Sequence, residues 1–271
     1  MPELSTLLPM VVALIVIGGF AGVVGGLLGV GGGIVLVPAF FYAFDAMGYG
    51  QGQIMQVCVA TSLATIVVTS IRSVSAHNRK GAVDWAVLKG WGPWLVLSSA
   101  IGVFVAARVP SSALQAVFGV LAGLAGLCMA FGRDSARPGD AMPTGAVRGG
   151  LASGVGFFSA LMGIGGGTFG VPLMTLFGVP IHRAVATASG FGVLIAVPSV
   201  LGFLMLKAEG APPWTIGAVN LPAFLVVIGT TLLTTPYGVR LAHSMNPKPL
   251  KRAFAVFLTL VALNMLRKVL W

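Results

Sequence analysis

Charged side chains are scarce in this chain. Only 8% of its 271 residues are Asp, Glu, Lys or Arg, whereas 57% are apolar and the mean hydropathy is +1.00. A soluble domain carries charge on roughly a quarter of its residues. These charges are too few to cover a globule in water, so lipid is the expected solvent for most of the surface. At about 20 apolar residues per span, there is room for about eight to ten helices, which predicts an all-α integral membrane protein.

Acidic residues are the rarest of the charged groups. There are six, against 16 Lys and Arg, and none of the six lies in the middle of an apolar block. A proton-coupled carrier usually needs a titratable group at depth, and no carboxylate of this chain can serve there. An intramembrane enzyme would need a nucleophile with a basic partner, or His and carboxylates as metal ligands, at the same depth. Neither set is present, so the sequence argues against an enzyme and implies no cofactor and no metal.

Cysteine is also nearly absent, because only Cys58 and Cys128 occur, each alone in an apolar stretch. This spacing predicts neither a disulfide framework nor a metal site. The net charge of +10 would suggest nucleic acid in a soluble protein, but the cytoplasmic enrichment of Lys and Arg explains it in a membrane protein. No nucleic-acid partner is therefore expected. Glu3 precedes the first apolar run and no Lys or Arg does, so we expect this segment to be retained rather than cleaved as a signal peptide.

Apolar blocks of similar length recur on both sides of a polar linker, and they indicate an internal duplication. The segment GVGGGIVLVP at 29–38 aligns with GIGGGTFGVP at 163–172, with six of ten positions identical and a separation of 134 residues. Further on, VATS at 59–62 matches VATA at 185–188. We expect a first repeat at 1–131, a cytoplasmic linker at 132–148 and a second repeat at 149–271, together forming one membrane domain. The ninth apolar block begins near residue 215.

The distribution of Lys and Arg distinguishes two topologies. If each glycine-rich break is a hairpin, the halves are inverted, and twelve of these residues face one side while Arg108, Lys207, Arg267 and Lys268 face the other. If each break belongs to one continuous crossing, the halves are parallel and the split is ten to six. Because cytoplasmic loops collect Lys and Arg, the first arrangement is favoured, with both termini outside. The sequence thus predicts two inverted repeats of about four to five helical segments each, with broken or re-entrant helices at the glycine-rich motifs, spanning the inner membrane several times.

The triple glycines are the strongest candidates for a site. Each glycine weakens a helix by about 1 kcal/mol relative to Ala, and in lipid unwound backbone is tolerated only where protein buries it or it lines a cavity. Broken helices of inverted repeats place free amides and helix N-termini near the midplane, where they can hold an anion. Close helix packing is the alternative, and the spacing of Gly18, Gly22 and Gly26 indicates it for that earlier stretch. The candidate backbone ligands are Gly31, Gly32, Gly33, Gly165, Gly166 and Gly167.

Hydroxyl side chains follow each break. Thr61, Ser62, Thr65 and Thr69 are spaced one to four residues apart on one predicted helix, and Thr187 and Ser189 hold the equivalent place in the second half. A hydroxyl row that faces a cavity could donate hydrogen bonds to an anion. Hydrogen bonds to helix backbones or between helices are the alternative, and the sequence leaves both open. The candidate side-chain ligands are Thr61, Ser62, Thr168, Thr187 and Ser189.

The doubled G-x-G-G-G-x4-P run and the A-T-S and A-T-A helices that follow it resemble the TauE/SafE sulfite exporter family of bacterial membrane proteins. The resemblance extends over nearly the whole chain. It implies secondary transport of small organosulfur oxyanions, of the sulfite or sulfonate class, across the inner membrane. The alternatives are transport of another small anion or a membrane assembly role without transport. The partners implied are a small anionic substrate and the lipid bilayer, with a homodimer left open.

Overall fold

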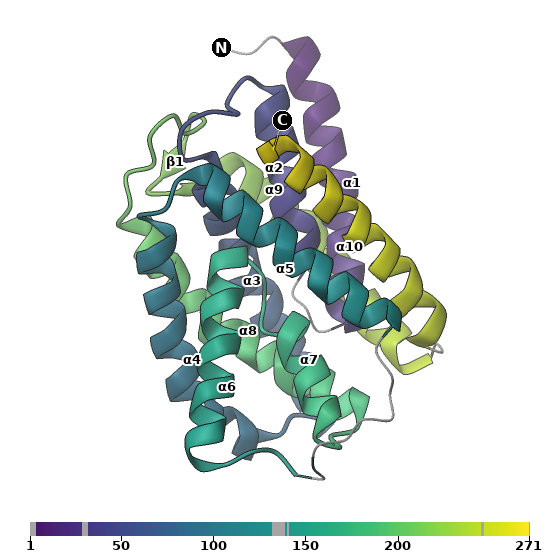
Figure 1. Cartoon of the computed structure of the whole chain (residues 1–271). Helices are drawn as coiled ribbons and strands as arrows, with labels where there is room; N and C mark the ends of the chain where they lie inside the picture. Colours follow the sequence, from purple (N-terminus) through teal and green to yellow (C-terminus); the bar gives the residue numbers. More distant parts are fainter. Residues whose placement is uncertain (1–3, 29–31, 132–138, 140, 245–246, 271) are drawn as a thin grey trace.

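The computed structural model of the chain describes residues 4–28, 32–131, 139, 141–244 and 247–270 (Figure 1). Over these residues the chain forms ten α-helices and one two-stranded antiparallel hairpin, which confirms the all-α prediction. The elements in chain order are α1 (Leu4–Leu28), α2 (Gly33–Ala46), α3 (Ile54–Asn78), α4 (Trp85–Ala106), α5 (Ser111–Phe131), α6 (Gly145–Met162), α7 (Gly167–Leu176), α8 (Ile181–Leu204), β1 (Thr215–Ile216), β2 (Val219–Asn220), α9 (Leu221–Ser244) and α10 (Pro247–Leu270).

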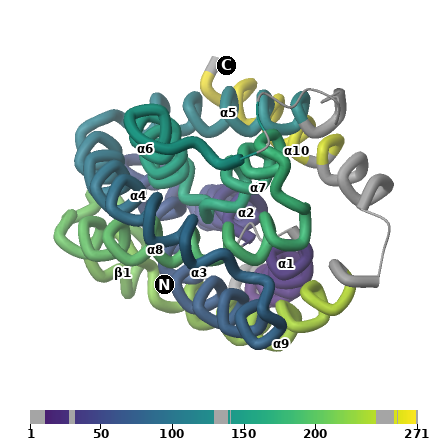
Figure 2. The backbone as a smooth tube through the Cα atoms, turned by 90° about the horizontal axis from the view of Figure 1, so that it is seen from below, coloured from purple at the N-terminus to yellow at the C-terminus, as the bar shows by residue number. Residues whose placement is uncertain are grey.

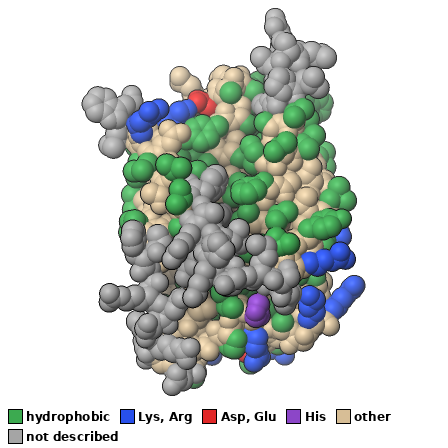
Figure 3. Space-filling view, turned by 90° about the vertical axis from the view of Figure 1, so that its right-hand side faces the viewer, with side chains coloured by type: hydrophobic (Ala, Val, Ile, Leu, Met, Phe, Trp, Pro, Cys, Tyr) green, Lys and Arg blue, Asp and Glu red, His purple; other side chains and the backbone are tan. Residues whose placement is uncertain are grey.

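Five helices are long and apolar enough to cross a membrane among the residues whose side chains are described, namely α3, α4, α5, α8 and α9. Large apolar side chains are exposed on their outer faces, including Leu97 and Phe104 on α4 and Leu225 and Leu233 on α9. On the face seen in Figure 3, apolar side chains spread over the middle of the molecule, whereas Lys and Arg gather near its two ends. Because water disfavours apolar surface of this extent, lipid covers it. The prediction of a multi-pass membrane protein is confirmed.

The helices of the two halves exchange partners across the molecule. The first helix of each half packs on the fourth helix of the other, α1 on α9 and α6 on α4, as the side and end views show (Figures 1 and 2). In the same way α3 packs on α9 and α8 on α4, while α3 contacts α8 and α5 contacts α10. Every one of these pairings recurs when the two halves are interchanged. The halves are therefore interlocked and share one core.

The exchange extends to individual close contacts. A Cβ atom on Gly22 of α1 would lie 2.8 Å from the Cα of Thr231 on α9. A Cβ atom on Gly156 of α6 would lie 3.1 Å from the Cα of Leu95 on α4. Gly22 and Gly156 are separated by the same 134 residues as the two glycine-rich runs. Small residues at both places let the paired backbones approach closely, as in other membrane helix interfaces.

Contacts between loops and helix ends define the two ends of the bundle. At one end, the N–H of Gln53, just before α3, donates to the carbonyl oxygen of Glu209 at 3.0 Å. At the other, Asp84, just before α4, forms an ion pair with Arg183 near the start of α8 at 3.4 Å. We name these the Gln53 end and the Asp84 end. Since α3 runs from Gln53 toward Asp84, the two ends lie on opposite sides of the bundle.

The two short helices, α2 and α7, lead toward opposite ends. Gly32 lies against the carbonyl group of Ala21 on α1, so the chain has turned back along α1 where α2 begins. From there α2 leads into α3 at the Gln53 end. After the second break, α7 leads into α8 at the Asp84 end, where Arg183 pairs with Asp84. The helix α6 also begins near that end, since a Cβ atom on Gly90 of α4 would lie 2.9 Å from Nη1 of Arg148.

The ninth apolar block differs from the prediction at its start. Residues 215–220 form β1 and β2 rather than helix, with Thr215 paired to Asn220 and Ile216 to Val219. Gly217 in the turn has φ +62, a left-handed conformation that glycine adopts without strain. The N–H of Ala218 donates to the carbonyl oxygen of Phe203 at 2.9 Å, which ties the hairpin to the end of α8. Apolar composition alone does not distinguish this hairpin from a helix, because its residues are also half buried.

Candidate functional site

The first glycine-rich break is a buried turn between α1 and α2. Gly32 has φ +75, and its carbonyl oxygen accepts hydrogen bonds from the N–H groups of Val35 and Leu36, at 3.0 and 3.1 Å. A Cβ atom on Gly32 would lie 2.8 Å from the carbonyl oxygen of Ala21. Both the positive φ and this close approach require glycine at the position. Gly31, also predicted as a ligand, lies outside the described residues.

The second break separates α6 from α7. Gly163 ends α6 with φ +66, and its carbonyl oxygen accepts a 2.7 Å hydrogen bond from the hydroxyl of Ser62 on α3. Gly165 has no regular structure, and Gly166, which precedes α7, has φ −59. Gly166 is thus right-handed where its counterpart Gly32 is left-handed. The two breaks therefore have related sequences but different backbone conformations.

The two breaks touch each other in the core. A Cβ atom on Gly33 would lie 2.5 Å from the carbonyl oxygen of Gly163 and 2.9 Å from the Cα of Ile164. Gly32 and Gly33 of the first break and residues 163–167 of the second are buried. Within the described residues, the N–H groups of Gly166, Gly167 and Thr168 have no hydrogen-bond acceptor, and neither has the buried Oγ1 of Thr168. Free donors of this kind at a helix start carry the positive end of the helix dipole. The described chain thus presents unpaired donors, and no carboxylate, at this junction.

Thr61 and Thr187 connect the two halves. The hydroxyl oxygen of Thr61 accepts a 3.0 Å hydrogen bond from the N–H of Asn220, just before α9. The hydroxyl oxygen of Thr187 accepts a 2.9 Å hydrogen bond from the N–H of Asp84, just before α4. Each threonine therefore holds the residue that precedes the fourth helix of the other half. The sequence placed both residues in the site but did not predict this contact.

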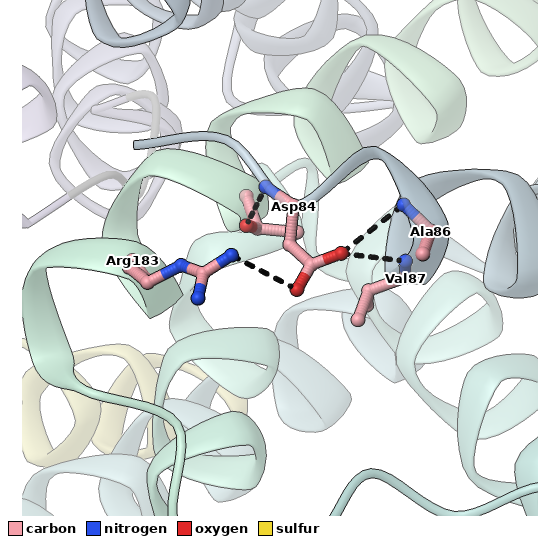
Figure 4. A network of polar contacts seen from close by, with 5 residues as sticks. Asp84, Ala86, Val87 and Arg183 are labelled. Carbon is pink, nitrogen blue, oxygen red and sulfur yellow. Dashed lines mark hydrogen bonds and ion pairs between the residues drawn. The ribbon is translucent and has the colours of Figure 1, made fainter. Parts of the chain in front are cut away.

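The residues that these threonines hold are helix caps. Oδ1 of Asp84 accepts hydrogen bonds from the N–H groups of Ala86 and Val87, both at 3.1 Å, while its Oδ2 faces Arg183 (Figure 4). Oδ1 of Asn220 accepts a hydrogen bond from the N–H of Ala223 at 3.1 Å. Asp and Asn are preferred at this position because they pair otherwise free donors of the first turn. Asp84 directly precedes an apolar run, and this position could have identified it as a cap, whereas Asn220 lies inside the apolar block that begins near residue 215.

A small polar cavity lies beside the junction, between α1, α3, α8 and α9. Its free volume is about 10 Å³, which is room for about one water molecule. Five of its eight lining residues carry hydroxyl groups, and Ser189 is the one predicted ligand among them. The lining residues are Ala21, Gly22, Gly25, Thr69, Ser70, Ser73, Ser189 and Thr235.

The hydroxyls of this cavity differ in whether they are already bonded. Thr69, Thr235 and Ser189 donate to carbonyl oxygens of their own helices, at 3.0, 2.6 and 2.6 Å. Ser73 is only 5% exposed, and its Oγ has no partner within the described part of the chain. Thr69, Thr235 and Ser189 therefore form the backbone hydrogen bonds of the alternative interpretation, whereas anion binding by the hydroxyl row stays a prediction. Ser73 continues the row by one turn beyond Thr69, and the same spacing could have identified it.

No ionisable side chain lines the cavity. Among the described residues, no group of three or more His, Cys, Asp or Glu lies close enough together to hold a metal ion. The electrostatic character of the region comes from hydroxyls, backbone N–H groups and helix ends. Such neutral donors favour a ligand that only accepts hydrogen bonds.

Comparison with known proteins matches most of this chain to one protein family. The family model for the sulfite exporter TauE/SafE matches residues 14–265. A probable membrane transporter protein of Haemophilus influenzae is 29% identical over 259 residues, which cover 94% of this chain and 97% of that protein. A probable membrane transporter protein of Methanocaldococcus jannaschii is 28% identical over 271 residues, which cover 97% of both chains. No solved structure matches this chain significantly.

Proposed function

Because the chain belongs to the TauE/SafE sulfite exporter family, a family of membrane transporters, we propose that it carries small organosulfur oxyanions of the sulfite or sulfonate class across the inner membrane. The observation that carries this proposal is the junction of the two breaks. There the N–H groups of Gly166, Gly167 and Thr168 have no acceptors in the described chain, and Gly166 and Gly167 are buried. Leaving a buried donor unpaired costs about 1–3 kcal/mol, so a ligand rich in acceptors would be stabilised at this place.

An oxyanion fits the chemistry of these groups. A sulfonate or sulfite presents three oxygen atoms that accept hydrogen bonds and carries the negative charge that the start of α7 favours. The free hydroxyl of Thr168 adds a donor at the junction that can turn toward those oxygens, and the free hydroxyl of Ser73 lines the cavity beside the junction. A carboxylate in the site would repel such a ligand, and no Asp or Glu lies among the residues that form the junction or the cavity. In this proposal Gly31–Gly33 and Gly165–Gly167 bind charge, and the hydroxyl of Thr168 sets the orientation of the ligand, because the hydroxyls of Ser62 and Ser189 already donate to carbonyl oxygens.

The cavity is smaller than the proposed substrate, so transport requires a change of shape. We propose that the repeats at 1–131 and 149–271 are inverted, joined by a cytoplasmic linker at 132–148, and that they move against each other. The exchange of helix partners and the opposite directions of α2 and α7 support this arrangement. Alternating access around a site at the repeat interface is the usual mechanism for such architectures.

Counterflow of a radioactive sulfonate or of sulfite in proteoliposomes tests the proposed function. Replacing Gly32 and Gly166 by Leu should abolish counterflow, because each side chain would meet backbone or packed side chains at the breaks. Gly229 on α9 is the matched control, since a Cβ atom there meets nothing within 4 Å, and Gly229→Leu should retain counterflow. Normal counterflow in the Gly32→Leu and Gly166→Leu proteins, with insertion checked by protease protection, would show that the breaks do not form the transport site.

A further inference from the structure

The cavity in the first half has a counterpart in the second half. Gly22 and Gly156 are equivalent positions of the two halves, 134 residues apart. At the same separation, Ser159 on α6 is the equivalent of Gly25, which lines the cavity. Thr61 and Thr187 are 126 residues apart, and at this separation Ser199 on α8 is the equivalent of Ser73. The helices α6 and α8 are in contact, as α1 and α3 are. The counterpart therefore lies between α6 and α8.

Ser159 and Ser199 are buried hydroxyls without partners. Both are 0% exposed, and neither Oγ has a hydrogen-bond partner within the described residues. Ser73, the counterpart of Ser199 beside the cavity, is in the same condition. Buried polar side chains in native proteins nearly always have a partner, so three unpaired hydroxyls at related positions require an explanation. A ligand or water that enters in another conformation would supply the missing partners.

The counterpart is closed by larger side chains. Phe191 and Ile195 stand on α8 where Thr65 and Thr69 stand on α3. The Phe191 ring stacks on Trp91 of α4, with ring centroids 5.8 Å apart. A Cβ atom on Gly170 of α7 would lie 2.9 Å from Cδ2 of Phe191, and the first half has Leu36 in place of this glycine. A large side chain has thus been exchanged between the facing helices. Of the two α8 positions, Ile195 is the one whose counterpart, Thr69, lines the cavity of the first half.

The two serines lie toward opposite ends of the bundle. Ser73 is five residues before the end of α3 at Asn78, which leads to the Asp84 end. Ser199 is five residues before the end of α8 at Leu204, which leads to the Gln53 end. The junction of Gly33 and Gly163 is between these two positions, because it contacts Val59 and Ile66 in the middle part of α3. A path that joins the two polar sites would pass the junction.

We propose that Ser159 and Ser199 form a second oxyanion site, closed here by Ile195, which opens toward the Gln53 end when the site beside Ser73 closes. The identity of the ligand in this proposal rests on the proposed function, whereas the position of the second site does not. The hydroxyls of Ser159 and Ser199 would donate to oxygens of the anion, as proposed for Ser73 on the other side. Movement of the Ile195 side chain, whose Cδ1 would lie 3.1 Å from a Cβ atom on Gly166, would provide the space.

Thiol labelling from each side of the membrane tests the second site. The parent is Cys128→Ser, which retains the fully buried Cys58 as an internal control, and Ser73→Cys and Ser199→Cys are made in it. A charged, membrane-impermeant methanethiosulfonate reagent is applied to vesicles of each orientation, with and without methanesulfonate. Methanesulfonate is used because sulfite would consume the reagent. We expect the thiols introduced at positions 73 and 199 to react from opposite sides, both faster than Cys58, and methanesulfonate to slow both reactions.

Two further variants test the part assigned to Ile195. Ile195→Thr, which restores the residue type of Thr69, should raise the rate of labelling at position 199 about tenfold by increasing the open fraction. Ile195→Leu, which keeps a large apolar side chain, should leave the rate near that of the parent. If position 199 reacts no faster than Cys58 from either side, or from the same side as position 73, the second site is refuted. Methanesulfonate counterflow by the parent is a separate test of the proposed function. If counterflow is absent while positions 73 and 199 still react from opposite sides, the proposed ligand is wrong and the second site is retained.

Discussion

Replacement of Gly33 by Ala tests whether the two breaks meet as described. The new methyl group would lie 2.5 Å from the carbonyl oxygen of Gly163, 2.6 Å from Cδ1 of Ile66 and 2.9 Å from the Cα of Ile164. Ile66 can turn away, but the two backbone atoms belong to the opposite half and cannot move without shifting α6. Forcing a methyl group into such packing costs about 1–3 kcal/mol.

The matched control for this change is Gly229→Ala. A Cβ atom there meets nothing within 4 Å, and Ala in place of Gly inside a helix is favourable by about 1 kcal/mol. We expect the melting temperature of Gly33→Ala in detergent to fall by about 2–12 °C on the scale known for domains of similar size. Fluorescence-detected gel filtration after heating measures this shift, and sulfonate counterflow measures the loss of transport. If Gly33→Ala melts and transports like Gly229→Ala, the contact between the two breaks is wrong.

Two other substitutions have defined outcomes. Thr187→Val leaves the N–H of Asp84 without its acceptor and should cost about 1–3 kcal/mol of stability. Thr175→Val is the control, because the exposed hydroxyl of Thr175 bonds only its own helix, and it should lower the stability much less in the same melting assay. Equal losses of stability in the two variants would contradict the role of Thr187 between the halves. Ser73→Ala removes an unpaired hydroxyl from the cavity, so the melting temperature should be unchanged or higher, whereas sulfonate counterflow should fall about two- to tenfold, the equivalent of one hydrogen bond. Unchanged counterflow at subsaturating sulfonate would remove Ser73 from the transport path.

Local sequence features predicted most of the helices and the places where they break. Apolar runs long enough to span a bilayer became α3, α4, α5, α8 and α9, because in lipid the backbone must satisfy its own hydrogen bonds. The triple glycines became breaks, because glycine does not hold a helix and permits the positive φ of Gly32. The hairpin at 215–220 was missed, since its short strands have the same apolar composition as the helix that follows.

Contacts between the halves could not be predicted in the same way. The acceptor of the Asp84 N–H is Thr187, 103 residues away, and that of the Asn220 N–H is Thr61, 159 residues away. No local propensity determines which of several buried hydroxyls will face such a donor. The position of the cavity beside the junction, with Ser70 and Ser73 in its wall, also depends on how α1, α3, α8 and α9 pack.

Hydropathy and glycine content, which act over a few residues, are enough to predict that this protein lies in the membrane, that it is helical, that its motif is doubled and that its helices break at the glycines. The contact of Gly33 with Gly163, the bonds by which Thr61 and Thr187 each hold the opposite half, and the stacking of Phe191 on Trp91 appear only in the folded chain. Those arrangements arise from packing between segments more than 90 residues apart in the chain, where shape and unpaired donors, rather than local preference, select the partner.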